Sequence, residues 1–400
     1  MKKIDIVIVG AGGFGKFYVD ECFDGESREL VNVVGVVEPY PESCPRMQEI
    51  IERKIPVYSN LEEFYRDNEA RLAAIATPIG FHTEQIIYCM QHGSDVLCEK
   101  PLCADEADIE KIAETEKKTG KTLTVGYQWS TSKAILDAKK DIISGIYGKP
   151  KLLKTLTLWP RDEKYFSRST GWAGKIYDKD GRPVYDSIAN NACAHYLHNL
   201  FFMLGKSMNT SLMPDSVYAE LARVNNIENF DTAVIKCGFP EGADAWFIAS
   251  HATAETVDPV LLYEFEKGKI LLVNNSIGAP EENHMDSYIN GEIIGILNDG
   301  RVIRYGIPDN GGNCRKLALC AKRIMGEKSY FCGTEGASVQ TRVINYIQKN
   351  FDIMQVHRVK KTDGFKVAEG MGAVLCKLYS EPKKGELINF IEKEDKNERK

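Results

Sequence analysis

The chain opens with a strand, a glycine-rich turn and a helix, and this opening constrains the fold of the residues after it. Residues 4–9 (IDIVIV) are almost continuously apolar and β-branched, which is typical of a strand buried on both faces of a parallel sheet. Gly10, Gly12 and Gly15 come next in the spacing G-x-G-x-x-G, and residues 16–21 read as the start of a helix. This order predicts a dinucleotide-binding turn, with Gly10 for the tight turn, Gly12 for close approach of a pyrophosphate and Gly15 for helix packing.

A second apolar run, Leu30 to Val37, ends at Glu38. A carboxylate at this place accepts hydrogen bonds from the ribose hydroxyls of NAD, and it repels the 2′-phosphate of NADP. We therefore expect NAD as the cofactor. The alternative is an ordinary glycine turn with a surface glutamate, which the combination of strand, turn, helix and acid disfavours.

The overall composition narrows the class of protein. Four hundred residues are more than one hydrophobic core usually organises, so two domains are expected. The formal charge of −6 argues against nucleic acid or an anionic membrane as a partner. No apolar run approaches the roughly 20 residues that span a bilayer. The eleven cysteines include no C-x-x-C pair, which predicts reduced thiols in a cytoplasmic protein.

Strand and helix patterns alternate through residues 1–126. Further apolar runs at residues 56–58, 72–77, 95–100 and 122–125 are separated by segments with helical spacing. Successive units of this length predict right-handed crossovers and an α/β domain with a doubly wound parallel (Rossmann) sheet.

The pattern changes in residues 127–380. Runs at 216–224, 231–238, 245–254, 261–266 and 270–273 alternate apolar and polar residues, which predicts a second α/β domain with an open-faced, mainly antiparallel sheet. Trp246 and Phe247 are adjacent and so must point to opposite faces. We expect one apolar face to be left without helices and to pair copies of the chain as a homo-oligomer, a dimer or tetramer. Residues 381–400 are expected to form a charged, solvated tail.

Four later motifs point to one family. They are Ala76-Thr77-Pro78 with His82, Cys98-Glu99-Lys100-Pro101, Val125-Gly126-Tyr127-Gln128, and Asn191-Ala192-Cys193-Ala194-His195. In this order and spacing the chain resembles the glucose–fructose oxidoreductase / inositol dehydrogenase (Gfo/Idh/MocA) family over about residues 3 to 350. The resemblance implies a Rossmann domain with an open-faced second domain, an NAD(P) cofactor, and a sugar or cyclitol substrate. The cofactor contacts that it implies are Gly10, Gly12, Gly13, Phe14, Gly15, Glu38, Thr77, Pro78, His82, Glu99, Lys100 and Gln128.

Lys100 is the first catalytic candidate. It comes directly after a predicted strand at the carboxyl edge of the sheet, where doubly wound sheets bind ligands. An ammonium there can hydrogen-bond a reacting hydroxyl and stabilise developing alkoxide charge. A cis Lys100–Pro101 peptide is possible, as the resemblance implies. Surface lysines at strand ends are common, but the Glu-Lys-Pro motif favours the functional role.

His195 is the second catalytic candidate, as a general base with an ordinary pKa near 6.5. The family usually carries an Asp four residues earlier, on the same helix face, and this chain has Asn191 there. An amide cannot stabilise an imidazolium as a carboxylate can. Asp186 and Asn190 are nearby candidates for the missing function, and a buried core histidine is the alternative for His195.

The resemblance implies further substrate contacts at Tyr127, Arg161, Trp172, Asn191 and His198, besides Lys100 and His195. His195 and His198 also have His-x-x-His spacing, but two histidines and an amide make a poor ligand set, so no metal is expected. Aromatic rings such as Trp172 would suit sugar faces, although core packing explains any single tryptophan equally well.

Three functions remain in competition. The first is an NAD-dependent dehydrogenase acting on a secondary hydroxyl of a sugar, glycoside or cyclitol. The second is a redox-neutral enzyme that oxidises the hydroxyl transiently, eliminates and returns the hydride. The third is a non-catalytic NAD-binding sensor, which retention of both Lys100 and His195 disfavours.

Overall fold

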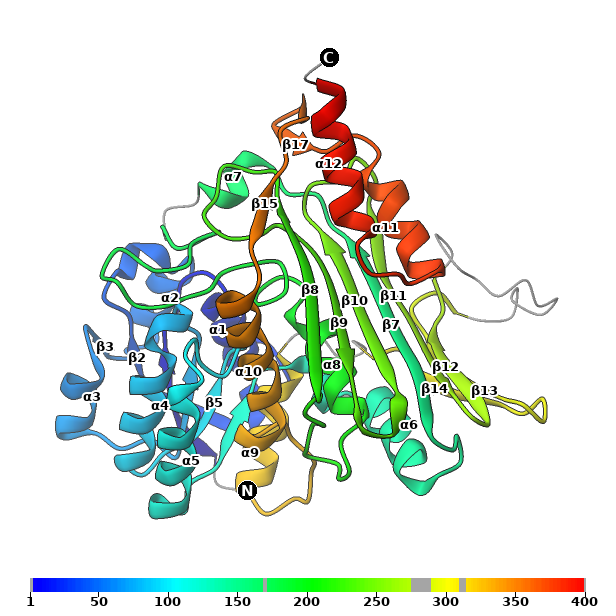
Figure 1. Cartoon of the computed structure of the whole chain (residues 1–400). Coiled ribbons are helices and arrows are strands. Elements are labelled where there is room, and N and C mark those ends of the chain that lie inside the picture. The colour runs from blue at the N-terminus through cyan, green and yellow to red at the C-terminus, as the bar shows by residue number, and fades with distance from the viewer. Residues whose placement is uncertain (1–2, 168–170, 275–288, 309–313, 399–400) are drawn as a thin grey trace. The chain divides into compact units, whose positions relative to one another are not determined.

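The computed structural model describes residues 3–167, 171–274, 289–308 and 314–398 (Figure 1). The chain divides into two compact units, residues 1–132 with 309–341 (unit 1) and residues 133–308 with 342–400 (unit 2). The sequence led us to expect boundaries near residues 126 and 380. The return of residues 309–341 to unit 1 differs from that expectation.

Unit 1 is built on a six-stranded parallel sheet in the order β3-β2-β1-β4-β5-β6. Its strands are β1 (Ile4–Val9), β2 (Val31–Val37), β3 (Val57–Tyr58), β4 (Leu72–Ile75), β5 (Asp95–Cys98) and β6 (Leu123–Val125). Its helices are α1 (Gly15–Phe23), α2 (Met47–Glu52), α3 (Leu61–Asp67), α4 (His82–Gln91), α5 (Ala107–Thr119) and α9 (Arg315–Ile324), with short 3-10 turns η1 (Glu26–Glu29), η2 (Pro41–Ser43), η3 (Ile79–Phe81) and η4 (Gln128–Thr131). The predicted doubly wound Rossmann sheet is confirmed.

Helix α9 joins the core of this unit from far along the chain. Leu317, Cys320 and Ala321 are buried in one cluster with Ile6 and Ile8 of β1. These α9 residues recur at helical spacing, so one face of the helix is apolar and packs on the sheet. Because every strand of the sheet is parallel, the residues that come after β1, β2, β4, β5 and β6 meet at one edge.

Unit 2 is built on a nine-stranded sheet in the order β14-β13-β12-β11-β7-β10-β9-β8-β15. The strands are β7 (Pro150–Leu158), β8 (Ser216–Arg223), β9 (Thr232–Gly238), β10 (Asp244–Ser250), β11 (Val257–Phe265), β12 (Gly268–Leu272), β13 (Ile293–Leu297), β14 (Val302–Gly306) and β15 (Ile353–Gln355). The other elements are α6 (Lys133–Ser144), α7 (Glu163–Phe166), α8 (Ala194–Met203), η5 (Pro240–Gly242), α11 (Met371–Ser380), α12 (Glu386–Glu398) and the β16 (Lys360–Thr362)–β17 (Phe365–Val367) hairpin, while α10 (Thr334–Asn350) continues from unit 1.

This sheet is mainly antiparallel, as predicted, with one insertion that the sequence pattern did not indicate. Strand β7 lies between β10 and β11, parallel to β10 and antiparallel to β11. The expected meander from β8 to β12 is therefore interrupted at its centre.

Both faces of the central strands are covered, which contradicts the expectation of a free apolar face. Trp246 and Ile248 pack in one cluster with Met371, Leu375 and other residues of α11 and α12. Figure 1 shows these two helices, in red and orange, lying over β7, β10 and β11. Phe247, which points to the opposite face, is also buried. The homo-oligomer prediction thus loses the free face on which it rested.

The segment expected to be a solvated tail contains α12. Its Leu387 and Ile391 are almost fully buried in the same cluster as α11. Glu220 of β8 accepts hydrogen bonds from the backbone N–H groups of Gly385, Leu387 and Ile388, so a buried carboxylate caps the helix start. Leu387 and Ile391, four residues apart, thus lie on one face of an otherwise highly charged helix and pack it into the core.

Candidate active site

The glycine turn of unit 1 has the geometry that its sequence predicts. Gly10 has φ of 82°, a left-handed conformation that residues with a Cβ rarely adopt. A Cβ on Gly15 would lie 1.9 Å from the carbonyl oxygen of Gly10, so only glycine lets α1 approach β1 this closely. Thr77, predicted to contact the cofactor, packs against the same turn, because a Cβ on Gly10 would lie 3.0 Å from its Cγ2.

Glu38 comes directly after β2 and holds the turn from the other side. Its Oε2 accepts hydrogen bonds from the backbone N–H groups of Ala11 (2.9 Å) and Gly12 (3.1 Å), and its Oε1 accepts one from Tyr40 (3.0 Å). The Glu38 residue is 7% exposed. The acid is therefore adjacent to the dinucleotide turn, where it suits ribose hydroxyls and opposes a 2′-phosphate.

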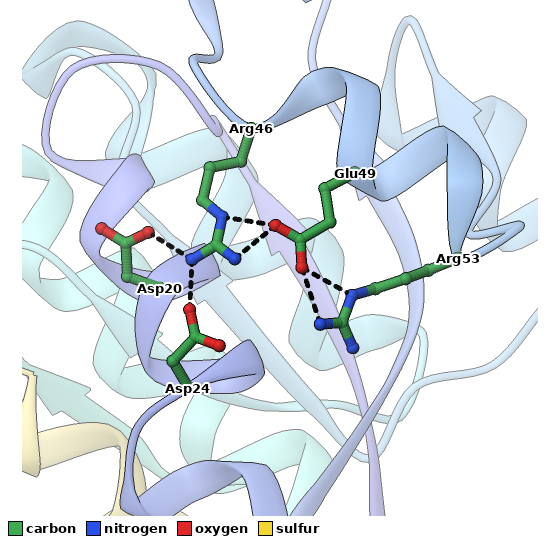
Figure 2. Close-up of polar contacts among 5 residues, drawn as sticks. All are labelled: Asp20, Asp24, Arg46, Glu49 and Arg53. Carbon is green, nitrogen blue, oxygen red and sulfur yellow. Dashed lines mark hydrogen bonds and ion pairs between the residues drawn. The ribbon is translucent and has the colours of Figure 1, made fainter.

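The first two arginines after Glu38, Arg46 and Arg53, are engaged by carboxylates (Figure 2). Arg46 pairs with Asp20 (2.9 Å), with Asp24 (2.5 Å) and with Glu49, and Arg53 pairs with Glu49 at 2.6 Å. Hydrogen bonds from Arg46 to these carboxylates raise the pKa of Arg46 and lower those of Asp24 and Glu49. Because both guanidinium groups are engaged in these ion pairs, neither is free to bind the 2′-phosphate of NADP. This supports NAD as the cofactor.

Lys100 lies just beyond β5 at the carboxyl edge of the sheet, half-buried, and its peptide to Pro101 is cis. His82 bridges the turns after β4 and β5. Its Nδ1 lies 2.9 Å from the carbonyl oxygen of Pro101, and its Nε2 lies 3.0 Å from that of Thr77. Burial lowers the pKa of His82. His82 thus directs both ring nitrogens at the backbone and fixes the turn that carries Lys100, and its predicted contact with the cofactor stays a prediction.

Glu99 belongs to a buried polar network that the sequence did not reveal. Its Oε1 accepts a hydrogen bond from the hydroxyl of Tyr18 (2.5 Å) and lies 2.5 Å from Nζ of Lys316, which also donates to the carbonyl oxygen of Gly126 (3.1 Å). Burial and the charge of Glu99 raise the pKa of Tyr18 well above its usual value. Glu99 thus joins α1, α9 and the ends of β5 and β6, and its predicted contact with the cofactor stays a prediction.

Tyr127 was predicted to contact substrate, and the structure buries it completely. Its hydroxyl donates to Oε1 of Gln340 at 3.0 Å, and burial raises its pKa well above the usual value. A phenol with a raised pKa stays protonated, so it cannot take a proton from a substrate. The buried side chain also has no exposed surface for a ligand. Gln128 and Phe14, two further predicted contacts, remain half-buried at the same edge of unit 1.

In unit 2, His195 is the second residue of α8 and is half-buried. The helix starts at Ala194, so Asn191 precedes it and does not share a helix face with His195 as expected. The amide of Asn191 donates to Oδ1 of Asp186 at 2.8 Å, and the other oxygen of Asp186 accepts from the N–H of Gly174 at 2.5 Å. A carboxylate is thus present beside Asn191 even though the sequence position itself is an amide.

His198, predicted as a substrate contact, is a buried histidine. It is 1% exposed and its ring stacks on that of Phe202 with centroids 5.6 Å apart. Burial, together with the charge of Lys139, lowers the pKa of His198 to about 3. The neutral imidazole is therefore part of the packing of α8 in unit 2. Asn190 likewise donates to loop carbonyls, those of Val184 and Tyr185.

An aromatic and cationic cluster lies at the carboxyl end of β7. The Trp159 ring meets that of Tyr196, the neighbour of His195, edge to face at 5.8 Å. Arg161 lies over the rings of Trp159 (5.8 Å) and Tyr165 (5.2 Å). Trp172 is half-buried in the next loop. Trp159 thus links Arg161 to Tyr196 of α8, the residue that follows His195 in the sequence.

Comparison with known proteins decides the family. Residues 4–127 match the model of the oxidoreductase family with an NAD-binding Rossmann fold, GFO_IDH_MocA. These residues form the Rossmann domain of the Gfo/Idh/MocA oxidoreductase family. The match includes the glycine turn, Glu38, Lys100 and Tyr127, so NAD is the cofactor that this domain serves.

Curated relatives share about half their length with this chain. The 2,7-anhydro-N-acetylneuraminate hydratase of Mediterraneibacter gnavus is 27% identical over 198 residues, 49% of this chain and 50% of the relative. The inositol 2-dehydrogenase of Rubrobacter xylanophilus is 28% identical over 157 residues, 38% of this chain and 43% of the relative. Among solved structures, the WlbA dehydrogenase of Bordetella pertussis in complex with NADH and UDP-GlcNAcA has a TM-score of 0.67 at 20% identity, and the match covers 87% of this chain and 96% of that one. That likeness extends the shared fold to both units.

Within the described residues, no helix is both long and apolar enough to span a bilayer.

Proposed function

We propose that the protein is an NAD-dependent dehydrogenase that oxidises a secondary hydroxyl of a sugar, glycoside or cyclitol. The observation that carries this is the position of Lys100, at the same edge of the parallel sheet as the glycine turn and Glu38. Doubly wound sheets bind ligands at that edge. The named activities of relatives, an inositol dehydrogenase among them, support this substrate class.

The site residues divide the chemistry among them. NAD, when bound, supplies the acceptor for the hydride that leaves the substrate carbon. His195 takes the proton of the hydroxyl as carbonyl character develops, and Asn191 with Asp186 supports it from the preceding loop. Lys100 donates a hydrogen bond to the same oxygen and stabilises its negative charge. His82 and the Glu99–Lys316 pair hold the backbone on either side of Lys100.

A redox-neutral enzyme is the second candidate, and one observation favours it. A relative that is 27% identical over about half of each chain is a hydratase of 2,7-anhydro-N-acetylneuraminate. Transient oxidation with later return of the hydride would use the same lysine and base, with no net change in NAD.

A panel of sugars, cyclitols and sugar derivatives tests both candidates. Each compound is incubated with the purified protein and excess NAD⁺, and NADH absorbance and substrate consumption are both measured. Equal amounts of NADH and ketone support the dehydrogenase, while consumption without NADH supports the redox-neutral enzyme. Binding of a sugar with neither change would contradict both and favour a non-catalytic sensor.

A further inference from the structure

Arg161 is a half-buried cation that has aromatic neighbours but no acidic partner among the described residues. Its guanidinium carbon lies 5.8 Å from the ring centroid of Trp159 and 5.2 Å from that of Tyr165. Its Nε is buried and makes no hydrogen bond to any described residue. A partly buried charge loses solvation and has no counter-ion here, so the position is one that an anionic ligand would stabilise.

The two carboxylates that follow Arg161 in the sequence, and the one that contacts Trp159, are engaged with other groups. Asp162 accepts from the backbone N–H of Tyr165, and Glu163 pairs with Lys361 at 2.9 Å. Asp258 accepts from the indole N–H of Trp159 at 3.1 Å. None of these three carboxylates forms an ion pair with Arg161.

The backbone of Arg161 is fixed by β10, and its side chain is linked through aromatic contacts to α8. Its backbone N–H donates to the carbonyl oxygen of His251 at the end of β10, 3.0 Å away. The Trp159 ring, over which its guanidinium lies, contacts Tyr196 of α8. Tyr196 is the neighbour of His195 in the sequence. A ligand held by Arg161 would thus extend along an aromatic surface that reaches the start of α8.

We propose that Arg161 binds the carboxylate of the substrate, and that the substrate class is therefore a sugar acid. The proposal rests on the proposed function, because it takes His195 as the base. A planar guanidinium matches a carboxylate with two parallel hydrogen bonds. One cation without an acidic partner among the described residues balances a monoanion, whereas a phosphate dianion would call for further cations. The rings of Trp159 and Tyr165 provide the apolar surface that a sugar ring packs against.

Matched acids and methyl esters test this assignment. The probes are glucuronate and 2,7-anhydro-N-acetylneuraminate, each beside its methyl ester, which keeps the shape and removes the charge. The NAD-loaded protein is titrated by calorimetry, and turnover is measured where it occurs. Wild type should favour acid over ester by at least about tenfold, and Arg161→Gln should weaken the acid roughly 10- to 100-fold, chiefly in KM, with the ester unchanged.

Two further variants complete the test. Arg301→Gln removes an exposed arginine that pairs with Asp299 in the same unit, and it should leave both ligands unaffected. Arg161→Lys keeps the charge without the planar fork and should lower the acid-to-ester ratio part of the way. If Arg161→Gln fails to fold, the acid-to-ester affinity ratios of wild type and Arg161→Lys decide.

The outcomes separate the carboxylate site from the proposed function. Binding of an acid that depends on Arg161, without any redox change, supports the carboxylate site and contradicts the dehydrogenase. Equal affinity of wild type for acid and ester, an equal loss of both in Arg161→Gln, or no acid bound at all would overturn the carboxylate site.

Discussion

At the level of single residues, Glu38 accepts hydrogen bonds from the glycine turn and is expected to favour NAD over NADP. We predict that Glu38→Ala weakens NAD binding roughly 10- to 100-fold, because hydrogen bonds to a charged acceptor are lost. NADP binding should change less, so discrimination falls. Affinities measured by calorimetry for both cofactors check this, with the exposed Glu42→Ala as control. A wild type that binds NADP as tightly as NAD would contradict the role given to Glu38.

Lys316 is the residue whose importance only the structure reveals. Lys316→Met should cost about 3–5 kcal/mol in the free energy of unfolding, because the buried carboxylate of Glu99 loses its counter-ion. The double variant with Glu99→Gln should lose less than Lys316→Met alone. Lys322→Met, on the same helix but in a more exposed pair with Glu26, should cost no more than about 1 kcal/mol. Denaturant titrations that give equal losses for both lysines would refute the account.

His198 should make unit 2 sensitive to acid. Its pKa is about 3 in the folded protein against 6.5 as the ordinary value, so the unfolded chain binds the extra proton between these limits. Stability is then complete above about pH 6.5 and falls as pH is lowered, by up to about 1.4 kcal/mol per pH unit. Thermal melts from about pH 7 to pH 4.5 should show a shallower slope for His198→Asn than for wild type. The exposed His357→Asn should keep the wild-type slope of stability against pH. If His198→Asn and His357→Asn show the same slope, the assignment is disproved.

At the level of elements, Glu220 caps the start of α12, while apolar residues of that helix dock it in the core of unit 2. Glu220→Gln should cost roughly 1–3 kcal/mol in the free energy of unfolding, because three backbone N–H groups at the start of α12 lose a charged acceptor. Glu386 lies in the first turn of the same helix and pairs with Lys383 on the surface. Glu386→Gln should therefore change stability by no more than about 0.5 kcal/mol. Indistinguishable denaturation midpoints for the two variants would argue against this cap.

The elements also show which parts of the fold a sequence can predict. The strand–turn–helix opening and the parallel sheet were predictable, because Gly10, Gly15 and Glu38 act on neighbours close in the chain. The strands β8 to β12 were predictable from alternation. The insertion of β7 and the docking of α9 were not, since they depend on pairing between segments far apart in sequence, which periodicity does not encode.

The candidate site divides in the same way. Lys100, His195 and Arg161 have side chains whose chemistry shows in the sequence. The roles of His82, Glu99 and Tyr127 became clear only from their partners, namely backbone carbonyls, Lys316 and Gln340, which motif positions cannot supply.

At the level of the whole molecule, helices α11 and α12 place the charged C-terminal region within unit 2. The sheet face that carries Trp246 and Ile248 is covered by these helices, so an association between copies would need another surface. The homo-oligomer therefore stays a prediction.

The most direct test of the central claim is a single-turnover measurement of hydride transfer to NAD⁺ from a sugar that the wild type oxidises. Lys100→Ala should slow it by about 10² to 10³ and His195→Ala by about 10² to 10⁴, while both keep NAD affinity. The wild-type rate should fall as pH is lowered, and His195→Ala should lose that dependence. A His195→Ala variant with near-normal rate and an unchanged pH profile, or a wild type that transfers hydride from no sugar or cyclitol, would contradict the account.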